Sequence, residues 1–259
     1  MLSVVVPFYN RNHVIDRCLK SILAELEPGD EIIVVDDCSQ ERFQSSYRAR
    51  VKYVGLEKNC GPVSARLQGA RIATNGHILF FDSDDELLPG WREYVARMLP
   101  RLNDCGVIFF PIYSTVLAPE KLVRTVKEYW EWVGDNCRKH DYVPLMRRSQ
   151  AVAMLDHLRA SEMWLFIRIF ENGRSALYLS QPIYIYHNDA GNQLSRERGL
   201  KFEFNGFERS SLGYVIGRFL AHRAYMRRYA PAQYFAWRRH LIKRSLLQFR
   251  VISAVKLII

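Results

Sequence analysis

Four carboxylates lie within five consecutive positions: Asp82, Asp84, Asp85 and Glu86. They follow residues 78–81, which read ILFF and are typical of a buried strand. Carboxylates this close raise each other's pKa unless a cation neutralises them. Oxygen ligands in such number suit Mg²⁺ or Mn²⁺, which keep bound waters and accept phosphate oxygens. The run therefore predicts a divalent-cation site at Asp82 and Asp84, with Asp85 in a secondary role.

The alternative for this run is the amino-terminal cap of a helix. Asp and Ser favour cap positions, and acidic residues favour the first helical turn. A cap accounts for one or two of the acidic residues, and we assign that role to Glu86. It does not explain why Asp82 and Asp84 flank the small Ser83 directly after a buried strand.

Strand-like and helix-like segments alternate through the first hundred residues. Apolar runs predict strands at 3–8, 31–35, 51–54 and 77–81, and helical spacing predicts helices at 14–25, 63–73 and 91–99. Because the strands are apolar on both faces, we expect an α/β fold with a mainly parallel sheet flanked by helices. Further along the chain we expect strands within 106–113 and 178–186, and helices at 149–158, 162–171 and beyond 209.

Polar residues follow each of the first four predicted strands. They are Pro7 and Tyr9, then Asp36 and Asp37, then residues 59–62, then the acidic run. In open α/β sheets, ligands bind beyond the carboxyl ends of the strands. We therefore expect these four clusters to form one site.

Read in order, these motifs resemble the family-2 glycosyltransferases. The resemblance rests on VVPFYN, IIVVDDCSQ, the stretch from NCGPVSARLQGA to FFDSDD, and the following LLPGW. It covers residues 2–195 and implies a single Rossmann-like domain of the GT-A type. It divides the chain into a catalytic domain at 1–205, with a nucleotide-sugar-binding half at 1–100 and an acceptor half at 101–205, and a basic helical extension at 206–259.

The resemblance implies a binding site for a nucleotide sugar. Pro7 and Tyr9 would line the pocket for the base and ribose, Asp37 would hydrogen-bond the base, and Asp36 would support that loop. Arg66, within ARLQGA, would face the diphosphate, the alternative being an arginine on a helix surface. The implied nucleotide-sugar-binding residues are Pro7, Tyr9, Asp36, Asp37, Arg66, Asp82, Ser83 and Asp84.

The same resemblance implies where a metal would bind. Asp82 and Asp84 match the family's DxD motif, so Mn²⁺ or Mg²⁺ is the expected cofactor. His187 lies in a segment that resembles the family's closing loop and is a third candidate ligand. A single His after a strand is more often a hydrogen-bonded structural residue, which is the alternative for His187.

The catalytic base implied by the resemblance is Glu162. The family pattern is similar to EDxxxWLRL, and this chain reads SEMWLFIRI from Ser161. Ser161 stands where the family usually has Glu, and Glu162 stands where it usually has Asp. The Asp side chain is shorter than that of Glu by one methylene, about 1.5 Å. The alternative is an acid that stabilises the first turn of a helix. On the acceptor side we expect Trp164, and also Arg148 at the end of a segment that resembles the acceptor wall.

The composition limits the class of protein. The 259 residues are 49% hydrophobic, enough for a sizeable core, and no stretch reaches the roughly 20 apolar residues that span a bilayer. The five cysteines include no CxxC pair, so we expect reduced thiols and no zinc site. The amino terminus lacks a signal-like segment, and we expect a cytoplasmic protein on the inner face of the membrane.

The positive charge is concentrated at the end of the chain. Residues 209–259 contain eleven of the 37 basic residues and no acidic one, whereas residues 1–208 hold 26 basic against 27 acidic residues. Basic helices with aromatic faces suit an anionic membrane surface, which we place first. Packing on the catalytic domain with solvated charges is the second interpretation, and nucleic-acid binding is the third.

These observations predict a metal-dependent inverting glycosyltransferase that moves a sugar, most often from a UDP-sugar, to a hydroxyl of a cell-surface glycan or a lipid-linked acceptor. One rival is a sugar nucleotidyltransferase, but residues 7–14 lack the expected glycine-rich triphosphate loop. The other rival is a non-catalytic protein of the same fold that binds glycan or nucleic acid.

Overall fold

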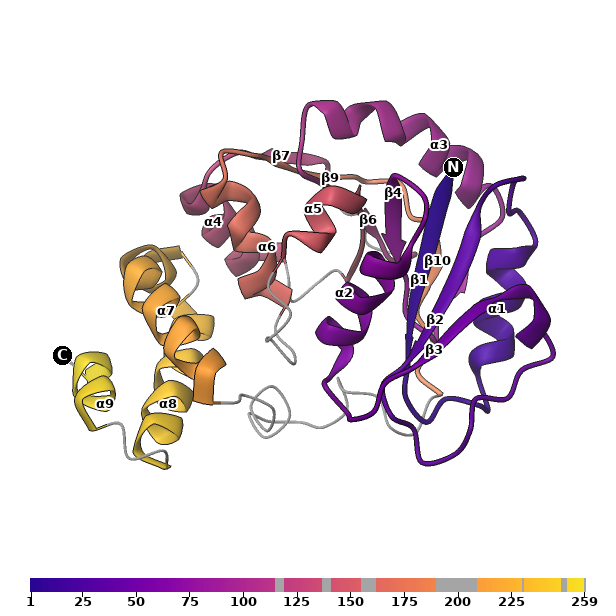
Figure 1. Ribbon diagram of the computed structural model, residues 1–259. Helices are drawn as coiled ribbons and strands as arrows, with labels where there is room; N and C mark the ends of the chain where they lie inside the picture. The colour runs from indigo at the N-terminus through magenta and orange to yellow at the C-terminus, as the bar shows by residue number, and fades with distance from the viewer. Residues whose placement is uncertain are drawn as a thin grey trace.

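The structure, a computed structural model, is an α/β domain with a group of helices at its carboxyl end (Figure 1). It describes residues 1–114, 119–136, 141–154, 162–189, 209–229, 231–247 and 251–258. The predicted domain boundary between residues 205 and 206 lies outside these ranges.

The first half of the chain forms the parallel part of an eight-stranded sheet. Its order is β3-β2-β1-β4, and all three pairs are parallel, as predicted. The strands are β1 (Leu2–Phe8), β2 (Glu31–Asp36), β3 (Lys52–Gly55) and β4 (His77–Phe80). The connecting segments hold α1 (Ile15–Leu23), α2 (Pro62–Ile72) and the short 3-10 helix η1 (Arg48–Arg50).

The second half continues the same sheet in the order β4-β8-β6-β9-β7. β8 runs antiparallel to both β4 and β6, so the sheet is mixed on this side. The strands are β6 (Val107–Pro111), β7 (Lys121–Val123), β8 (Tyr142–Arg147) and β9 (Ala176–Tyr178). The helices are α3 (Trp91–Met98), η2 (Leu99–Asn103), α4 (Val126–Asn136), α5 (Arg148–Val152) and α6 (Glu162–Glu171).

A separate two-stranded ribbon corrects the prediction for Glu86. β5 (Glu86–Leu87) pairs antiparallel with β10 (Tyr184–Ile185). Glu86 is therefore a strand residue rather than a helix-start acid, and the next helix begins only at Trp91. The ribbon ties the acidic run to a segment almost a hundred residues away.

Alternating side chains of the central strands build a core on each face of the sheet. Val5 and Ile33 belong to the core beneath α2, whereas Val4 and Val34 belong to the core beneath α1. A glycine at position 69 lets α2 approach β1 closely, because a Cβ there would clash with the Val5 side chain. This close packing fixes the height of α2 over the sheet.

The carboxyl-terminal helices pack on the domain through one face. They are α7 (Arg209–Tyr229), α8 (Pro231–Leu247) and α9 (Val251–Ile258). Val215 and Phe219 of α7 belong to the same buried cluster as Trp130 of α4, and Figure 1 shows α7 beside α4 and α6. No helix in the described part of the chain is long and apolar enough to cross a membrane. The predicted helical extension is thus confirmed over its described residues.

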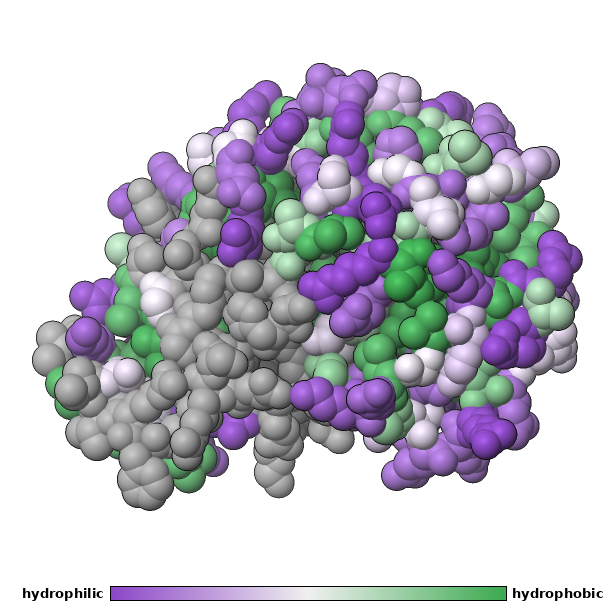
Figure 2. All heavy atoms as spheres, in the orientation of Figure 1, coloured by the Kyte–Doolittle hydropathy of each residue, from purple (hydrophilic) through white to green (hydrophobic). Residues whose placement is uncertain are grey.

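The surface of the α/β part carries both hydrophilic and hydrophobic side chains. On the face shown in Figure 2, hydrophilic and hydrophobic residues are interspersed over this part of the molecule.

His240 of α8 makes stability depend on pH. It is 6% exposed, and desolvation together with Arg244 and Lys243 lowers its pKa from 6.5 to about 3. The unfolded chain takes up a proton near pH 6.5 and the folded chain does not, so stability is full above that pH and is lost as the pH falls toward 3. We expect the free energy of unfolding to drop by at most about 1.4 kcal/mol per pH unit in this window.

Urea denaturation of the full chain between pH 7.5 and pH 5 measures this loss. In His240→Gln, which cannot titrate, the slope should be clearly smaller. Identical slopes in the two proteins would assign the pH dependence to other groups.

Candidate functional site

The loops that follow β1 and β2 are bound to each other at the carboxyl edge of the sheet. The Asn10 backbone N–H donates to Ser39 Oγ, and the Gln40 N–H donates to Asn10 Oδ1, both at 2.9 Å. Asn10 and Cys38 have positive φ angles of 52° and 62°, an uncommon conformation for residues other than glycine. The hydrogen bonds therefore hold both loops in conformations that the chain does not favour by itself.

Asp36 and Asp37 are both buried, and each accepts hydrogen bonds from a different set of residues. Asp36 accepts hydrogen bonds from the Ser39 N–H and the Tyr53 hydroxyl, each at 2.9 Å. Desolvation, followed by the hydrogen bond to Asp36, raises the pKa of Tyr53 to about 12. Asp37 accepts from the backbone N–H groups of Cys60 at 2.6 Å and Gly61 at 2.7 Å.

Pro7 and Tyr9 lie where the first strand ends. Pro7 is buried within β1 opposite Val35 of β2. Tyr9 directly follows the strand and is 38% exposed, so its ring is available to a ligand. Both residues are thus at the edge where the loops of β1 and β2 meet.

Two arginines from different elements pair with the acidic run. Arg11, in the loop after β1, donates from Nη1 to Asp84 Oδ2 at 2.9 Å, and Arg66 of α2 forms an ion pair with Asp82. The Asp84 side chain is 12% exposed and that of Asp82 is 44% exposed. Ser83 is buried between them. The structure thus brings the predicted Arg66 to the acidic run, and it adds Arg11, which the sequence analysis did not select.

Crowded negative charge alters the titration of two further aspartates. Asp85 is 3% exposed, and desolvation followed by the charges of Asp82 and Asp84 raises its pKa to about 9. Asp141, just before β8, keeps contact with solvent, yet desolvation by the surrounding atoms and the charge of Asp82 raise its pKa as well. Asp141 was also missed, because only the pairing of β8 with β4 brings it to this edge.

The segment after β10 lies against the same edge. The His187 backbone N–H donates to Asp85 Oδ1 at 3.3 Å, and its ring Nε2 lies 3.0 Å from Glu86 Oε2. Arg17 of α1 links the two segments, since it donates to the Asp84 carbonyl oxygen at 2.7 Å and pairs with Asp189. The structure therefore places His187 next to the acidic run, with Glu86 as a ring partner.

The donor set at this edge fits a divalent cation that arrives with a nucleotide. Among the described residues, no group of three or more His, Cys, Asp or Glu side chains could hold a metal. Mg²⁺ and Mn²⁺ need no such group, because they commonly take one or two carboxylates plus phosphate oxygens and water. Asp82 and Asp84 supply that number, and they lie beside Asp85, whose pKa is raised by desolvation and then by their charges.

Arg148 lies at the opposite edge of the sheet. Its guanidinium donates to the carbonyl oxygens of Ala70 at 3.1 Å and Arg71 at 2.7 Å, near the end of α2. β8 runs antiparallel to β4, so its first residues lie at the carboxyl edge and its last residues do not. This position does not fit the predicted acceptor-side role, and it makes Arg148 a partner for the last carbonyls of α2.

Glu162 and Trp164 lie in the first turn of α6. The helix is fixed from its inner side, where Phe166 packs edge-on against Phe109 of β6 at a ring separation of 4.9 Å. The side chains of Glu162 and Trp164 lie outside the described part of the structure, as does Ser161. The roles of base and acceptor contact therefore stay predictions.

Removing the arginine beside Asp84 should destabilise the protein and change its response to metal. Arg11→Gln leaves a buried carboxylate without this counter-ion, and we expect the free energy of unfolding to fall by about 3 kcal/mol. Mn²⁺ can then replace the lost positive charge, so its addition should raise the melting temperature more in Arg11→Gln than in the wild type.

Thermal denaturation with and without Mn²⁺ measures both effects. Arg50→Gln, which removes an exposed arginine, is the matched control and should behave as the wild type does. Equal stability and an equal Mn²⁺ shift in Arg11→Gln would contradict the pairing.

Sequence comparison finds related proteins that match part of this chain. The chain is 34% identical over 113 residues to an uncharacterized glycosyltransferase of Haemophilus influenzae, covering 43% of this chain and 38% of that protein. It is 34% identical over 109 residues to the succinoglycan biosynthesis protein ExoO of Rhizobium meliloti, covering 40% of this chain and 30% of that one. The matches thus span well under half the length of these curated relatives.

The fold is also found in a solved structure. The chain superposes on S. aureus TarS 1–349 in complex with UDP-GlcNAc with a TM-score of 0.57 and 21% identity, covering 75% of this chain and 60% of that one. This similarity shows a shared GT-A-type fold. The sequence model of the family described as glycosyl transferase family 2 matches residues 3–132, half of the chain. The protein belongs to glycosyl transferase family 2.

Proposed function

We propose that this glycosyltransferase is a metal-dependent, inverting enzyme that moves a sugar from a UDP-sugar to a hydroxyl of a cell-surface glycan or lipid-linked acceptor. The observation that carries the proposal is the pairing of Asp82 and Asp84 with Arg66 and Arg11 at the carboxyl edge of the sheet. Carboxylates for a cation and guanidiniums for a diphosphate are what this donor requires.

The chemistry can be assigned to individual groups. Tyr9 and Asp37 would bind the base, and Arg11 and Arg66 would bind the diphosphate. Glu162 would take the proton from the acceptor hydroxyl, whose oxygen then attacks the anomeric carbon from the face opposite the diphosphate. The new glycosidic C–O bond forms as the bond to the diphosphate breaks, which inverts the configuration. A cation held by Asp82 and Asp84 would stabilise the charge on the departing diphosphate.

Names of relatives support the donor and the acceptor class. The solved neighbour was crystallised with UDP-GlcNAc, and relatives include a succinoglycan biosynthesis protein and a teichoic acid poly(glycerol phosphate) polymerase of Staphylococcus epidermidis. These names point to envelope polysaccharides. We further propose that the protein works at the cytoplasmic face of the membrane, with its basic extension toward the lipid.

A thermal-shift screen of nucleotide sugars with and without Mn²⁺ tests the donor. We expect one UDP-sugar to raise the melting temperature, and to do so more with Mn²⁺ present. Release of UDP on addition of acceptor then separates catalysis from binding. UDP binding without release in any donor and acceptor combination would favour the non-catalytic alternative, and release of pyrophosphate from a sugar phosphate and UTP would favour the nucleotidyltransferase.

A further inference from the structure

A polar cavity lies among the carboxyl-terminal helices. It has a volume of about 590 Å³ and is lined from α7, α8 and α9 by Phe219, Arg223, Ala224, Arg227, Arg228, Tyr234 and Leu257. This volume is in the usual range for a small-ligand pocket, about 300–1,000 Å³. None of the roles proposed above uses it.

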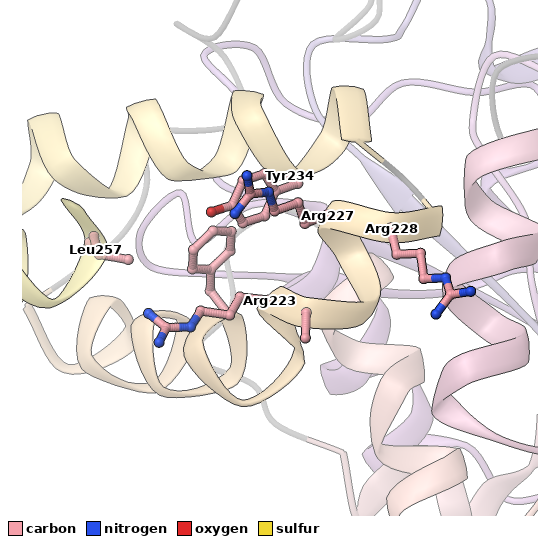
Figure 3. A pocket seen from close by; sticks show the side chains of 7 residues that line it. Arg223, Arg227, Arg228, Tyr234 and Leu257 are labelled. Atoms are coloured by element: carbon pink, nitrogen blue, oxygen red, sulfur yellow. The ribbon is translucent and has the colours of Figure 1, made fainter. Parts of the chain in front are cut away.

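The spacing of the α7 residues explains how the cavity becomes basic. Phe219, Arg223 and Arg227 are each four residues apart and so lie on one face of the helix. In Figure 3, Arg223 and Arg227 lie on the side of α7 near Tyr234 and Leu257, whereas Arg228 points away from them. Arg223 and Arg227 are exposed to solvent, so both guanidiniums are accessible to a ligand.

The helices that line the cavity carry no acidic side chain of their own. Residues 209–259 contain no Asp or Glu, so neither α7 nor its neighbours α8 and α9 can supply a carboxylate. Part of the cavity lining is aromatic, because the rings of Phe219 and Tyr234 stack there at 5.5 Å with an angle of 16° between their planes. A cavity of this kind suits an anion attached to an apolar group.

Exposed apolar side chains on two of the helices that line the cavity favour an anionic lipid bilayer as the source of the anion. Each of the following is at least 45% exposed and lies on α8 or α9: Phe235, Leu246, Leu247, Val255 and Ile258. Large exposed apolar side chains next to arginines are typical of helices at a membrane interface. A nucleic acid would leave these side chains in water, because its backbone offers them no apolar partner.

We propose that the cavity between α7, α8 and α9 binds the phosphate group of an anionic lipid, with Arg223 and Arg227 as its ligands and the apolar ends of α8 and α9 in the bilayer. The inference rests on the membrane contact proposed above and names the site that makes it. Two guanidiniums can donate paired hydrogen bonds to phosphate oxygens. Binding through such directed hydrogen bonds is stronger and more specific than electrostatic attraction to a charged surface alone.

Co-sedimentation of the full chain with vesicles tests the site. The vesicles are phosphatidylcholine alone or phosphatidylcholine with phosphatidylglycerol. The pocket variant is Arg223→Gln with Arg227→Gln. The matched control, Arg239→Gln with Lys243→Gln, removes the same charge at the same spacing from exposed positions on α8 that do not line the cavity. Circular dichroism checks that both variants are folded.

The wild type should bind the anionic vesicles and bind phosphatidylcholine alone weakly. The pocket variant should lose at least about tenfold in partition onto anionic vesicles, and the control less than about threefold. Equal losses in both variants would overturn the pocket while leaving membrane contact intact, and no binding by the wild type would overturn both.

Two competitors complete the test. Soluble glycerol phosphate should compete only weakly, because it lacks the apolar part. Saturation by glycerol phosphate without vesicle binding, or arginine-dependent binding of a short oligonucleotide in place of vesicles, would overturn the lipid as the ligand.

Discussion

Asp84→Asn is expected to lower the rate of sugar transfer by at least about a thousandfold and to remove the metal-dependent part of UDP binding. Asparagine keeps the shape of the side chain, and its carbonyl oxygen can still accept the 2.9 Å hydrogen bond from Arg11. The variant therefore changes the charge on a buried group without leaving a cavity. What it removes is the anionic ligand proposed above for a cation that would stabilise the departing diphosphate.

Calorimetry of UDP binding with and without Mn²⁺, alongside UDP release in the presence of donor and acceptor, measures both effects. Asp104→Asn is the control, because Asp104 is exposed and lies in the turn before β6, away from the acidic run. Turnover within about tenfold of the wild type in Asp84→Asn would remove the metal role from Asp84.

Glu162→Gln should leave donor binding unchanged and lower turnover by about a hundredfold to ten-thousandfold. Glutamine has nearly the same size and cannot take a proton, so only the step that deprotonates the acceptor hydroxyl is lost. The prediction depends on the position of Glu162 in the first turn of α6, which Phe166 anchors to β6.

Glu162→Asp provides the internal comparison. Aspartate is the residue of the family pattern, but it withdraws the carboxylate by about 1.5 Å. It should retain more activity than Glu162→Gln, with the donor Kd unchanged in both. Full activity in Glu162→Gln would place the base on another residue, and weakened donor binding would show that Glu162 acts on the donor side instead.

The sequence was most informative where local patterns decide structure. The runs that became β1, β2 and β4 are apolar on both faces, which is typical of strands in a parallel sheet covered by helices. Because parallel strands end at one edge, the meeting of their polar loops followed from the same pattern. The α/β fold could be predicted on this basis, and the glycosyltransferase family from the resemblance of the ordered motifs at the strand ends.

The errors and omissions have a common physical cause. The pairing of Arg11 with Asp84 joins residues 73 positions apart, and no local pattern reports such a contact. The two-residue strand that holds Glu86 is too short to show a period, so its acid was assigned to a helix. Arg148 was placed from a motif alone, and the antiparallel direction of β8, which decides its position, depends on pairing across the sheet.

The two ion pairs at the acidic run have a consequence for the ionic strength at which the enzyme works. Asp82, Asp84, Arg11 and Arg66 carry no net charge as a group, and a nucleotide diphosphate that arrives with a divalent cation is itself close to neutral. On binding, the arginines would pair with the diphosphate and the aspartates with the cation, so the net charge of the site would not change. We therefore expect the donor affinity measured by calorimetry to change little between low and physiological salt. Attraction between two oppositely charged surfaces would instead weaken, because salt screens it over about 10 Å.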